Sequence, residues 1–282
     1  MQTLRQLEAL RQAVAALRTG CGRIALVPTM GALHAGHLAL VEEAKRAADH
    51  VVVSIFVNPT QFAPGEDFDR YPRREAADSR MLTDVGVAML WMPPVEVMYP
   101  AEHATRIRVS GVSEVLDGAH RPGHFDGVAT VVAKLLNQVR PDAALFGEKD
   151  YQQLCVVRRM VADLDLSVAI HGVATQRDDD GLALSSRNIY LDTDERARAV
   201  ALPRALGVAA KAIERGDAIG PAVDAARDAL GAAGFAIDYV ELVDPETLGK
   251  YDPARGGRLL AAARMRTTRL IDNVAVAPIE QG

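Results

Sequence analysis

The sequence predicts an α/β protein, in which a doubly wound, parallel, Rossmann-like sheet is followed by a smaller C-terminal α+β domain. Three observations lead to this prediction. Short apolar runs such as residues 51–57 (VVVSIFV) have the length and continuity of strands buried on both faces. These runs alternate with helical patterns, which is the order of parallel sheets. From about residue 177 the pattern changes to Ala-rich helices followed by strand-like runs.

The N-terminal elements follow one another in a regular β–α order. The apolar spacing at residues 4–10 predicts an amphipathic helix, and Pro141 ends a strong helical pattern that begins near Val128. Expected strands cover residues 24–27, 51–57, 87–90, 143–146 and 168–170, and further expected helices cover residues 38–44, 73–85, 128–139 and 151–164.

The C-terminal elements suggest a separate unit. A polar loop at residues 177–181 is a plausible hinge, so we expect one domain over residues 1–176 and a second over residues 177–282. Within the second domain, expected helices cover residues 194–215 and 221–233, and expected strands cover residues 237–243, 258–263 and 268–271.

Composition excludes several classes of protein. A length of 282 residues with 49% hydrophobic content is enough to bury a sizeable core. A formal net charge of −5 argues against a general nucleic-acid surface. Cys21 and Cys155 are far apart and have no metal-binding spacing, which favours a reducing, cytoplasmic location. The charged N-terminus is unlike a signal peptide, and no apolar run has membrane-spanning length, so no membrane partner is expected.

The most informative stretch is residues 28–37 (PTMGALHAGH), which follows the expected strand at 24–27 and leads into a helix. A turn that opens a helix presents free backbone N–H groups, which hold phosphate. Gly31 and Gly36 have the spacing of a P-loop, but His37 stands in place of the lysine, so a Walker-type NTPase is not expected. His34 and His37 could donate hydrogen bonds to phosphate oxygens; alternatively, they only cap the helix. A zinc site is a weaker reading because His-x-x-His lacks the helical spacing of four.

Polar side chains follow two other expected strands. Asn58 and Gln61 come after the strand at 51–57, and Lys149 and Asp150 come after the strand at 143–146. Ligands bind at the carboxyl ends of parallel strands, so these residues and the two histidines are predicted to share one site. The alternative for Lys149 and Asp150 is a solvated ion pair, and the alternative for Gln61 is ordinary surface solvation.

Five motifs in order carry a family resemblance. They are residues 28–37 (PTMGALHAGH), 56–62 (FVNPTQF), 71–73 (YPR), 146–153 (FGEKDYQQ) and 185–188 (SSRN). Over essentially its whole length, the chain resembles the pantoate–β-alanine ligases (pantothenate synthetases) of the HIGH-motif nucleotidyltransferase superfamily. Leu184 and Gln176 depart from the residues usual at those positions, which are methionine and valine.

The resemblance implies condensation of (R)-pantoate with β-alanine to pantothenate. The pantoate carboxylate would attack the α-phosphorus of ATP and release pyrophosphate. The β-alanine amine would then attack the pantoyl adenylate and release AMP. The residues that the resemblance assigns to catalysis are His37, His34, Lys149 and Arg187. Those it assigns to ATP are Met30, Gly31, His34, Gly36, His37, Gly147, Glu148, Lys149, Asp150, Gln176, Leu184, Ser185, Ser186 and Arg187. The alternative for Ser185 and Ser186 is that they only cap the segment at residues 188–190.

The same resemblance assigns the other substrates and a metal. Gln61, Gln153 and Asn58 would bind pantoate, with Gln61 also meeting β-alanine. Mg²⁺ would accompany ATP, mainly on phosphate oxygens, with Asp78 as the expected protein ligand and Asp67 and Asp69 as alternatives. Further expectations are a cytoplasmic homodimer without nucleic-acid or membrane partners. His124 and Asp126 are expected to begin a long helix at the edge of the cleft.

Three readings of function compete. The first is the ligase, and the second is a related HxGH nucleotidyltransferase or class I synthetase that activates another small acid. The third is a catalytically silent nucleotide-binding regulator, although retention of His34, His37, Lys149 and Arg187 argues against it. Acid-dependent exchange of pyrophosphate into ATP separates the three.

Overall fold

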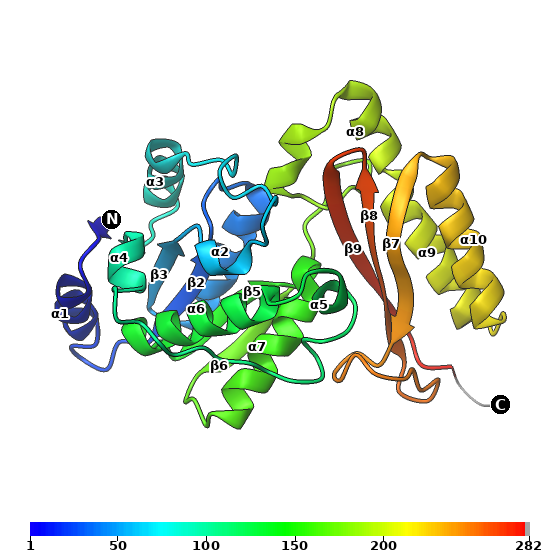
Figure 1. The fold of residues 1–282 in the computed structure, drawn as a ribbon. Coiled ribbons are helices and arrows are strands. Elements are labelled where there is room, and N and C mark those ends of the chain that lie inside the picture. Colours follow the sequence, from blue (N-terminus) through cyan, green and yellow to red (C-terminus); the bar gives the residue numbers. More distant parts are fainter. Residues whose placement is uncertain (280–282) are drawn as a thin grey trace.

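The computed structural model describes residues 1–279 and has two sheets with helices packed on them (Figure 1). The larger sheet has six parallel strands in the order β1-β4-β3-β2-β5-β6. Its strands are β1 (Gln2–Leu4), β2 (Ile24–Thr29), β3 (His50–Ile55), β4 (Met89–Trp91), β5 (Ala143–Gly147) and β6 (Ala169–Val173). This order places β2 between β3 and β5, so the segments that follow these three strands lie side by side.

Helices cover both faces of the larger sheet because each central strand is apolar on both sides. Ile24 and Leu26 of β2 belong to one core, and their neighbours Ala25 and Val27 belong to another. The N-terminal helices are α1 (Leu7–Leu17), α2 (Ala35–Ala47), α3 (Glu75–Asp84), α4 (Val95–Met98), α5 (Asp117–His120), α6 (His124–Val139) and α7 (Tyr151–Asp163), with 3-10 turns η1 (Pro59–Gln61) and η2 (Glu148–Asp150). The predicted doubly wound parallel fold is confirmed.

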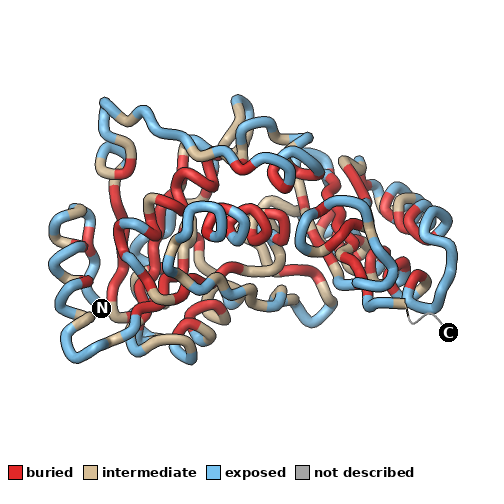
Figure 2. Tube along the Cα trace, turned by 90° about the horizontal axis from the view of Figure 1, so that it is seen from below, coloured by how far each residue is buried: buried red, intermediate tan, exposed pale blue. Residues whose placement is uncertain are grey.

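The smaller sheet is antiparallel, in the order β7-β8-β9, with β7 (Phe235–Val243), β8 (Gly257–Met265) and β9 (Thr268–Val276). One face packs on α9 (Ala201–Glu214) and α10 (Ile219–Ala232) through residues such as Leu259 and Leu270. The other face, which includes Leu260 and Ala262, joins the core of the N-terminal part. The 3-10 turn η3 (Ser186–Tyr190) and helix α8 (Thr193–Ala199) complete the chain order. Buried residues therefore run through both parts of the molecule (Figure 2).

Several expected elements differ from the structure. The expected strand over residues 268–271 continues to Val276 as β9. Residues 2–4 form the edge strand β1, and the first helix begins at Leu7 rather than Leu4. The expected helix over residues 194–215 is divided at Val200 into α8 and α9. Pro203 explains the division, because a proline has no N–H to donate to the carbonyl of Ala199 one turn earlier.

The division of the chain at residues 176 and 177 stays a prediction. It falls in the connection between β6 and η3. Over residues 1–279, none of the helices combines the length and the apolar character needed to cross a bilayer.

Candidate active site

The carboxyl ends of β2, β3, β5 and β6 open onto one cavity of about 220 Å³. The turn after β2 carries the two histidines, η1 after β3 carries Gln61, and η2 after β5 carries Lys149. The segment after β6 brings Gln176, and the start of η3 brings Arg187. Residues from five separate parts of the sequence therefore meet where the parallel-sheet rule predicts a ligand.

In the turn after β2, the two imidazoles are hydrogen-bonded to the backbone of the turn itself. His34 is the N-cap of α2, and its Nδ1 accepts from Gly36 N–H at 3.2 Å, while His37 Nδ1 accepts from His34 N–H at 3.3 Å. This reciprocal arrangement is a capping box built from imidazoles. Position 36 has to be glycine, because a Cβ there would lie 2.9 Å from the His34 ring. The histidines therefore cap the helix as predicted. Because capping uses only Nδ1, Nε2 of each ring remains available to a ligand.

These hydrogen bonds set the tautomer and charge of both rings. Because Nδ1 accepts a hydrogen bond in each ring, the proton of the neutral imidazole is on Nε2. Each Nε2–H can therefore donate a hydrogen bond to a ligand in the cavity. Burial lowers the pKa of His37 to about 3, with further lowering by His34 and Lys149. Burial and Lys149 also lower the pKa of His34. At neutral pH the two rings are therefore uncharged hydrogen-bond donors.

Asp78, the expected magnesium ligand, is hydrogen-bonded to the same turn. Its two carboxylate oxygens accept from the backbone N–H groups of Ala32 and Leu33, both at 2.9 Å, and the side chain is buried. Asp78 does not line the cavity. Within residues 1–279, no three potential metal-binding His, Cys, Asp or Glu side chains gather in one place. These residues do not form a protein-only metal cage, and the role of Asp78 as a ligand stays a prediction.

Lys149 reaches the cavity from η2. Its ammonium lies 3.7 Å from the carboxylate of Asp150 and its side chain is 18% exposed. The ion pair between Lys149 and Asp150 is therefore present. It differs from the solvated ion pair that was the alternative to a binding site, because the Lys149 side chain is mostly buried. Glu148 points elsewhere and pairs with Arg258 of β8.

Arg187 is held by a carboxylate of the loop between η1 and α3. Its Nε and Nη2 donate to the two oxygens of Asp67, both at 3.0 Å. Next to Asp67 in the sequence, Glu66 accepts two bonds of 2.7 Å from Arg121. Ser186 forms a 3.1 Å hydrogen bond with the hydroxyl of Tyr71. Two guanidinium groups at the cavity are thus each paired with a neighbouring carboxylate of one loop.

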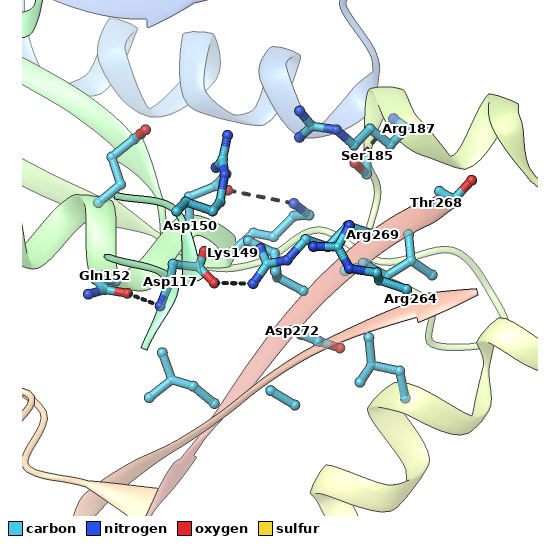
Figure 3. A pocket seen from close by; sticks show the side chains of 18 of the residues that line it. Asp117, Lys149, Asp150, Gln152, Ser185, Arg187, Arg264, Thr268, Arg269 and Asp272 are labelled. Atoms are coloured by element: carbon cyan, nitrogen blue, oxygen red, sulfur yellow. Dashed lines mark hydrogen bonds and ion pairs between the residues drawn. The ribbon is translucent and has the colours of Figure 1, made fainter. Parts of the chain in front are cut away.

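A second cavity of about 360 Å³ adjoins the first and lies against the smaller sheet (Figure 3). Lys149, Arg187 and Arg121 line both cavities. Here α5 is joined to the smaller sheet by Asp117, which accepts from Arg269 at 2.7 Å and from the Tyr239 hydroxyl at 2.8 Å. The cation-bearing segments therefore lie at the junction between the two parts of the molecule.

The far end of the first cavity combines amides with an apolar wall. Asn58 Nδ2 donates to Gln61 Oε1 at 3.1 Å and to the carbonyl of Gly127 at 3.1 Å. His124 is hydrogen-bonded to the carbonyl of Gln61 at 2.8 Å, and burial lowers its pKa to about 4. One face of α6 supplies the apolar wall, through Val128, Val131, Val132 and Leu135. Such a pocket suits a small acid with hydroxyl groups and a branched apolar body.

Most of the residues expected in the site come together. The first cavity is lined by Met30, His34, Gly36, His37, Asn58, Gln61, Gly147, Lys149, Asp150, Gln153, Gln176, Leu184, Ser185, Ser186 and Arg187. Gly31, Glu148 and Asp78 are the expected residues outside that lining. Gly31 instead takes a φ of +84° in the turn, which favours glycine.

Two contributions to the cavity were not predicted from the sequence. The α6 wall has the i, i+3, i+4, i+7 spacing of any buried helix face, so the spacing alone could not separate a ligand wall from a core. Thr175, beside Gln176, also lines the cavity, and in the described part of the chain its buried hydroxyl has no hydrogen-bond partner. A buried unpaired hydroxyl at a cavity is a candidate ligand contact.

Comparison with known proteins identifies the family. The profile of the pantoate-beta-alanine ligases matches residues 2–275. The chain belongs to the pantoate–β-alanine ligase family. A relative in Rhizorhabdus wittichii, named pantothenate synthetase, is 61% identical over 99% of both chains. Another of that name in Novosphingobium aromaticivorans is 57% identical over 99% of this chain and 100% of its own.

Solved structures of the pantoate–β-alanine ligase family have the same fold. Pantothenate synthetase from Thermus thermophilus superposes with a TM-score of 0.92 at 48% identity and covers 99% of this chain and 100% of its own. The pantoate-beta-alanine ligase of Francisella tularensis, solved in complex with beta-gamma ATP and β-alanine, has a TM-score of 0.82 at 32% identity, covering 98% and 97%.

Proposed function

We propose that this protein is an AMP-forming ligase that condenses (R)-pantoate with β-alanine, using ATP, to give pantothenate. The observation that carries the proposal is that one cavity is lined by the imidazoles of His34 and His37, the cations Lys149 and Arg187, and the amides of Gln61 and Gln153. Membership of the pantoate–β-alanine ligase family supports the reaction class. The alternative, activation of another small acid, lacks such support.

In the first step, a carboxylate oxygen of pantoate bonds to the α-phosphorus of ATP, and the bond from that phosphorus to the leaving pyrophosphate breaks. The difficulty is that one anion attacks another. Nε2–H of His34 and His37 would donate to phosphate oxygens, and Lys149 and Arg187 would neutralise charge that develops in the transition state. The low pKa of His37, which burial causes, favours hydrogen-bond donation over transfer of a proton.

In the second step, the amine of β-alanine bonds to the acyl carbon of pantoyl adenylate, and the acyl carbon–oxygen bond breaks to release AMP. Gln61 and Gln153 would orient pantoate by its hydroxyl groups, with Asn58 fixing Gln61 and the α6 wall packing on the branched carbons. Enforced proximity would supply much of the rate, since the two reactants would be held in one cavity.

Mg²⁺ would neutralise charge on the triphosphate and would be held mainly by phosphate oxygens. Asp150 lines the cavity and is a possible carboxylate ligand. Asp78 could take part only through lone pairs that its two backbone hydrogen bonds leave available. These carboxylates are too few to hold a metal ion by themselves, so they fit an ion that binds together with ATP.

The test is exchange of labelled pyrophosphate into ATP. We expect exchange that depends on pantoate and proceeds without β-alanine. Exchange that requires a different acid would redirect the assignment to the alternative activity. Absence of exchange with any acid, in a protein that binds ATP, would favour the silent regulator.

Two further parts of the proposal concern the protein in its cell. We propose a homodimer, to be tested by sedimentation equilibrium, in which a species of twice the chain mass is expected and a monomer at all concentrations would contradict it. We also propose a cytoplasmic location, to be tested by fractionation of the cells that produce the protein.

A further inference from the structure

Two neighbouring residues of β9, Asp272 and Asn273, connect the smaller sheet to both cation-bearing segments of the site. Both are almost fully buried, at 2% and 3% exposure. Because successive side chains of a strand point to opposite faces, the two contact different partners. Neither lines the first cavity, so neither is placed to touch a ligand there, although both line the adjoining second cavity.

Asn273 holds the turn that carries Lys149. Its Nδ2 donates to the backbone carbonyls of Glu148 at 2.9 Å and Lys149 at 3.0 Å. Its Oδ1 accepts from Nε of Arg258 at 2.6 Å, and Arg258 also reaches the Glu148 carboxylate at 3.1 Å. With both ends of the amide engaged, the orientation of Asn273 is fixed. The backbone of η2 is therefore pinned from another sheet.

Asp272 holds the segment that leads to Arg187. It forms a two-bond ion pair with Arg177, at 2.7 and 2.9 Å. Arg177 also donates to the carbonyl of Gly181 and forms an antiparallel bridge with Ala183. The segment over residues 176–184 is thus a short hairpin that runs directly into Ser185. In Figure 3, Asp272 lies on β9 beneath Arg264 and Arg269, on the side of the adjoining cavity away from Asp150.

We propose that Asp272 and Asn273 are positioning residues that set the placement of Lys149 and of residues 185–187 relative to each other. One rigid dipeptide on β9 then fixes two phosphate-binding segments that come from distant parts of the sequence. The proposal rests on the proposed function, because it assigns the effect to transfer of the adenylyl group. If the two residues were only structural, their substitution would lower the stability of the protein by the same amount whether or not Lys149 was present.

The test is a double-mutant cycle between Asn273→Ala and Lys149→Ala, read by pantoate-dependent pyrophosphate exchange. We expect Asn273→Ala alone to lower the rate roughly 10- to 100-fold, because small misplacements of catalytic groups are costly. In the Lys149→Ala background, the same change is expected to cost less than about threefold, since residues that act through one another are not additive. The KM for pantoate is expected to stay within about twofold.

A matched control separates positioning from loss of stability. Asp192→Ala removes the N-cap of α8, in which Asp192 accepts from Glu195 N–H at 2.8 Å. It should lower the melting temperature, as loss of a cap does, while leaving the exchange rate within about twofold. A control that lost as much exchange as Asn273→Ala at equal melting temperature would overturn the proposal.

The outcomes of the cycle are distinguishable from failure of the proposed function. An equal loss in both backgrounds, or no loss from Asn273→Ala, overturns the positioning role. Absence of pantoate-dependent exchange in the unaltered protein overturns the proposed function instead. Should Asn273→Ala not fold, Asn273→Asp keeps the size and the contact with Arg258, removes the donor and carries the same expectation. If exchange by Lys149→Ala is too slow to detect, the affinity of all four proteins for ATP is measured by calorimetry instead. Additive effects of the two substitutions on that affinity would also overturn the positioning role.

The second arm pairs Asp272→Asn with Arg187→Ala. The amide is close in size to the carboxylate, but it removes the charge that holds Arg177. We expect the KM for ATP to rise roughly 3- to 10-fold, and this rise to vanish when Arg187 is already absent. A rise of the same size in both backgrounds contradicts the role of Asp272.

Discussion

The two sides of the cavity are built in different ways. The imidazole wall, formed by residues 30–37, takes its geometry mainly from hydrogen bonds between the two imidazoles and the backbone of one turn, with Asp78 of α3 as its distant support. The cation wall, formed by Lys149 and residues 185–187, depends on partners far away in the sequence, such as Asp67 for Arg187. The first wall is neutral and complete without a ligand, whereas the second holds its charges against internal carboxylates. Under the proposed function, an incoming triphosphate would meet preformed donors on one side and would exchange ion pairs on the other.

Both walls should contribute to adenylation by similar amounts despite this difference. His37→Ala removes a neutral donor and Lys149→Ala removes a cation, and each is expected to lower the rate of pyrophosphate exchange on the order of 10²- to 10³-fold with the fold intact. Exchange kinetics check the rate, and circular dichroism checks the fold. Near-normal exchange by either variant would remove that wall from the mechanism.

Acid should destabilise the protein through the imidazole wall. The folded-state pKa of His37 is about 3 because of burial, against about 6.5 in an unfolded chain, so the unfolded state binds more protons between these values. Stability is therefore complete above pH 6.5 and falls as the pH drops toward 3. At pH 4.5, the loss attributable to His37 is about 2–3 kcal/mol.

Urea unfolding at pH 7 and pH 4.5 measures this loss. His37→Gln, which cannot titrate, should show a smaller fall in the free energy of unfolding than the unaltered protein. His124 has a pKa of about 4, also lowered by burial, and remains in the variant, so part of the acid sensitivity persists. Identical falls for the two proteins would contradict the buried, neutral state of His37.

The cation wall should gain affinity when its internal competitor is removed. Asp67→Asn breaks the two-bond pair with Arg187 and leaves the guanidinium available for phosphate. We expect the KM for ATP to fall roughly 3- to 10-fold, since a half-buried charged pair must otherwise be separated. Initial-rate kinetics at saturating pantoate measure it.

Asp163→Asn is the matched control, because Asp163 pairs with Arg159 within α7 and neither residue lines either cavity. It is expected to leave the KM for ATP within about twofold. A higher KM for ATP in Asp67→Asn would show that Asp67 orders Arg187 for binding instead of competing with the ligand.

The imidazole wall could be predicted from the sequence, and much of the cation wall could not. A buried strand at residues 24–27 that leads through glycines into a helix is a local pattern, and so is the placement of Gln61 and Lys149 after strands. The pair of Arg187 with Asp67 spans 120 residues, and the bond of Asn273 to the Lys149 carbonyl spans 124. No local periodicity encodes contacts at such separations.

The fold shows the same division. Long apolar strands and amphipathic helices were predicted, because burial on one or two faces imposes a period on the sequence. The edge strand β1 was missed, since it has three residues and only one of them is buried. The division between α8 and α9 was missed because the apolar pattern runs through it, although Pro203 was the available signal.

The most direct test of the account is to follow oxygen from the carboxylate of pantoate. In both walls, the donors and cations are proposed to act on the α-phosphorus of ATP. With ¹⁸O in the pantoate carboxylate, we expect one labelled oxygen in the phosphate of AMP for each pantothenate formed, detected by mass spectrometry. Label in inorganic phosphate, with ADP as the nucleotide product, would mean attack at the γ-phosphorus and would contradict the account.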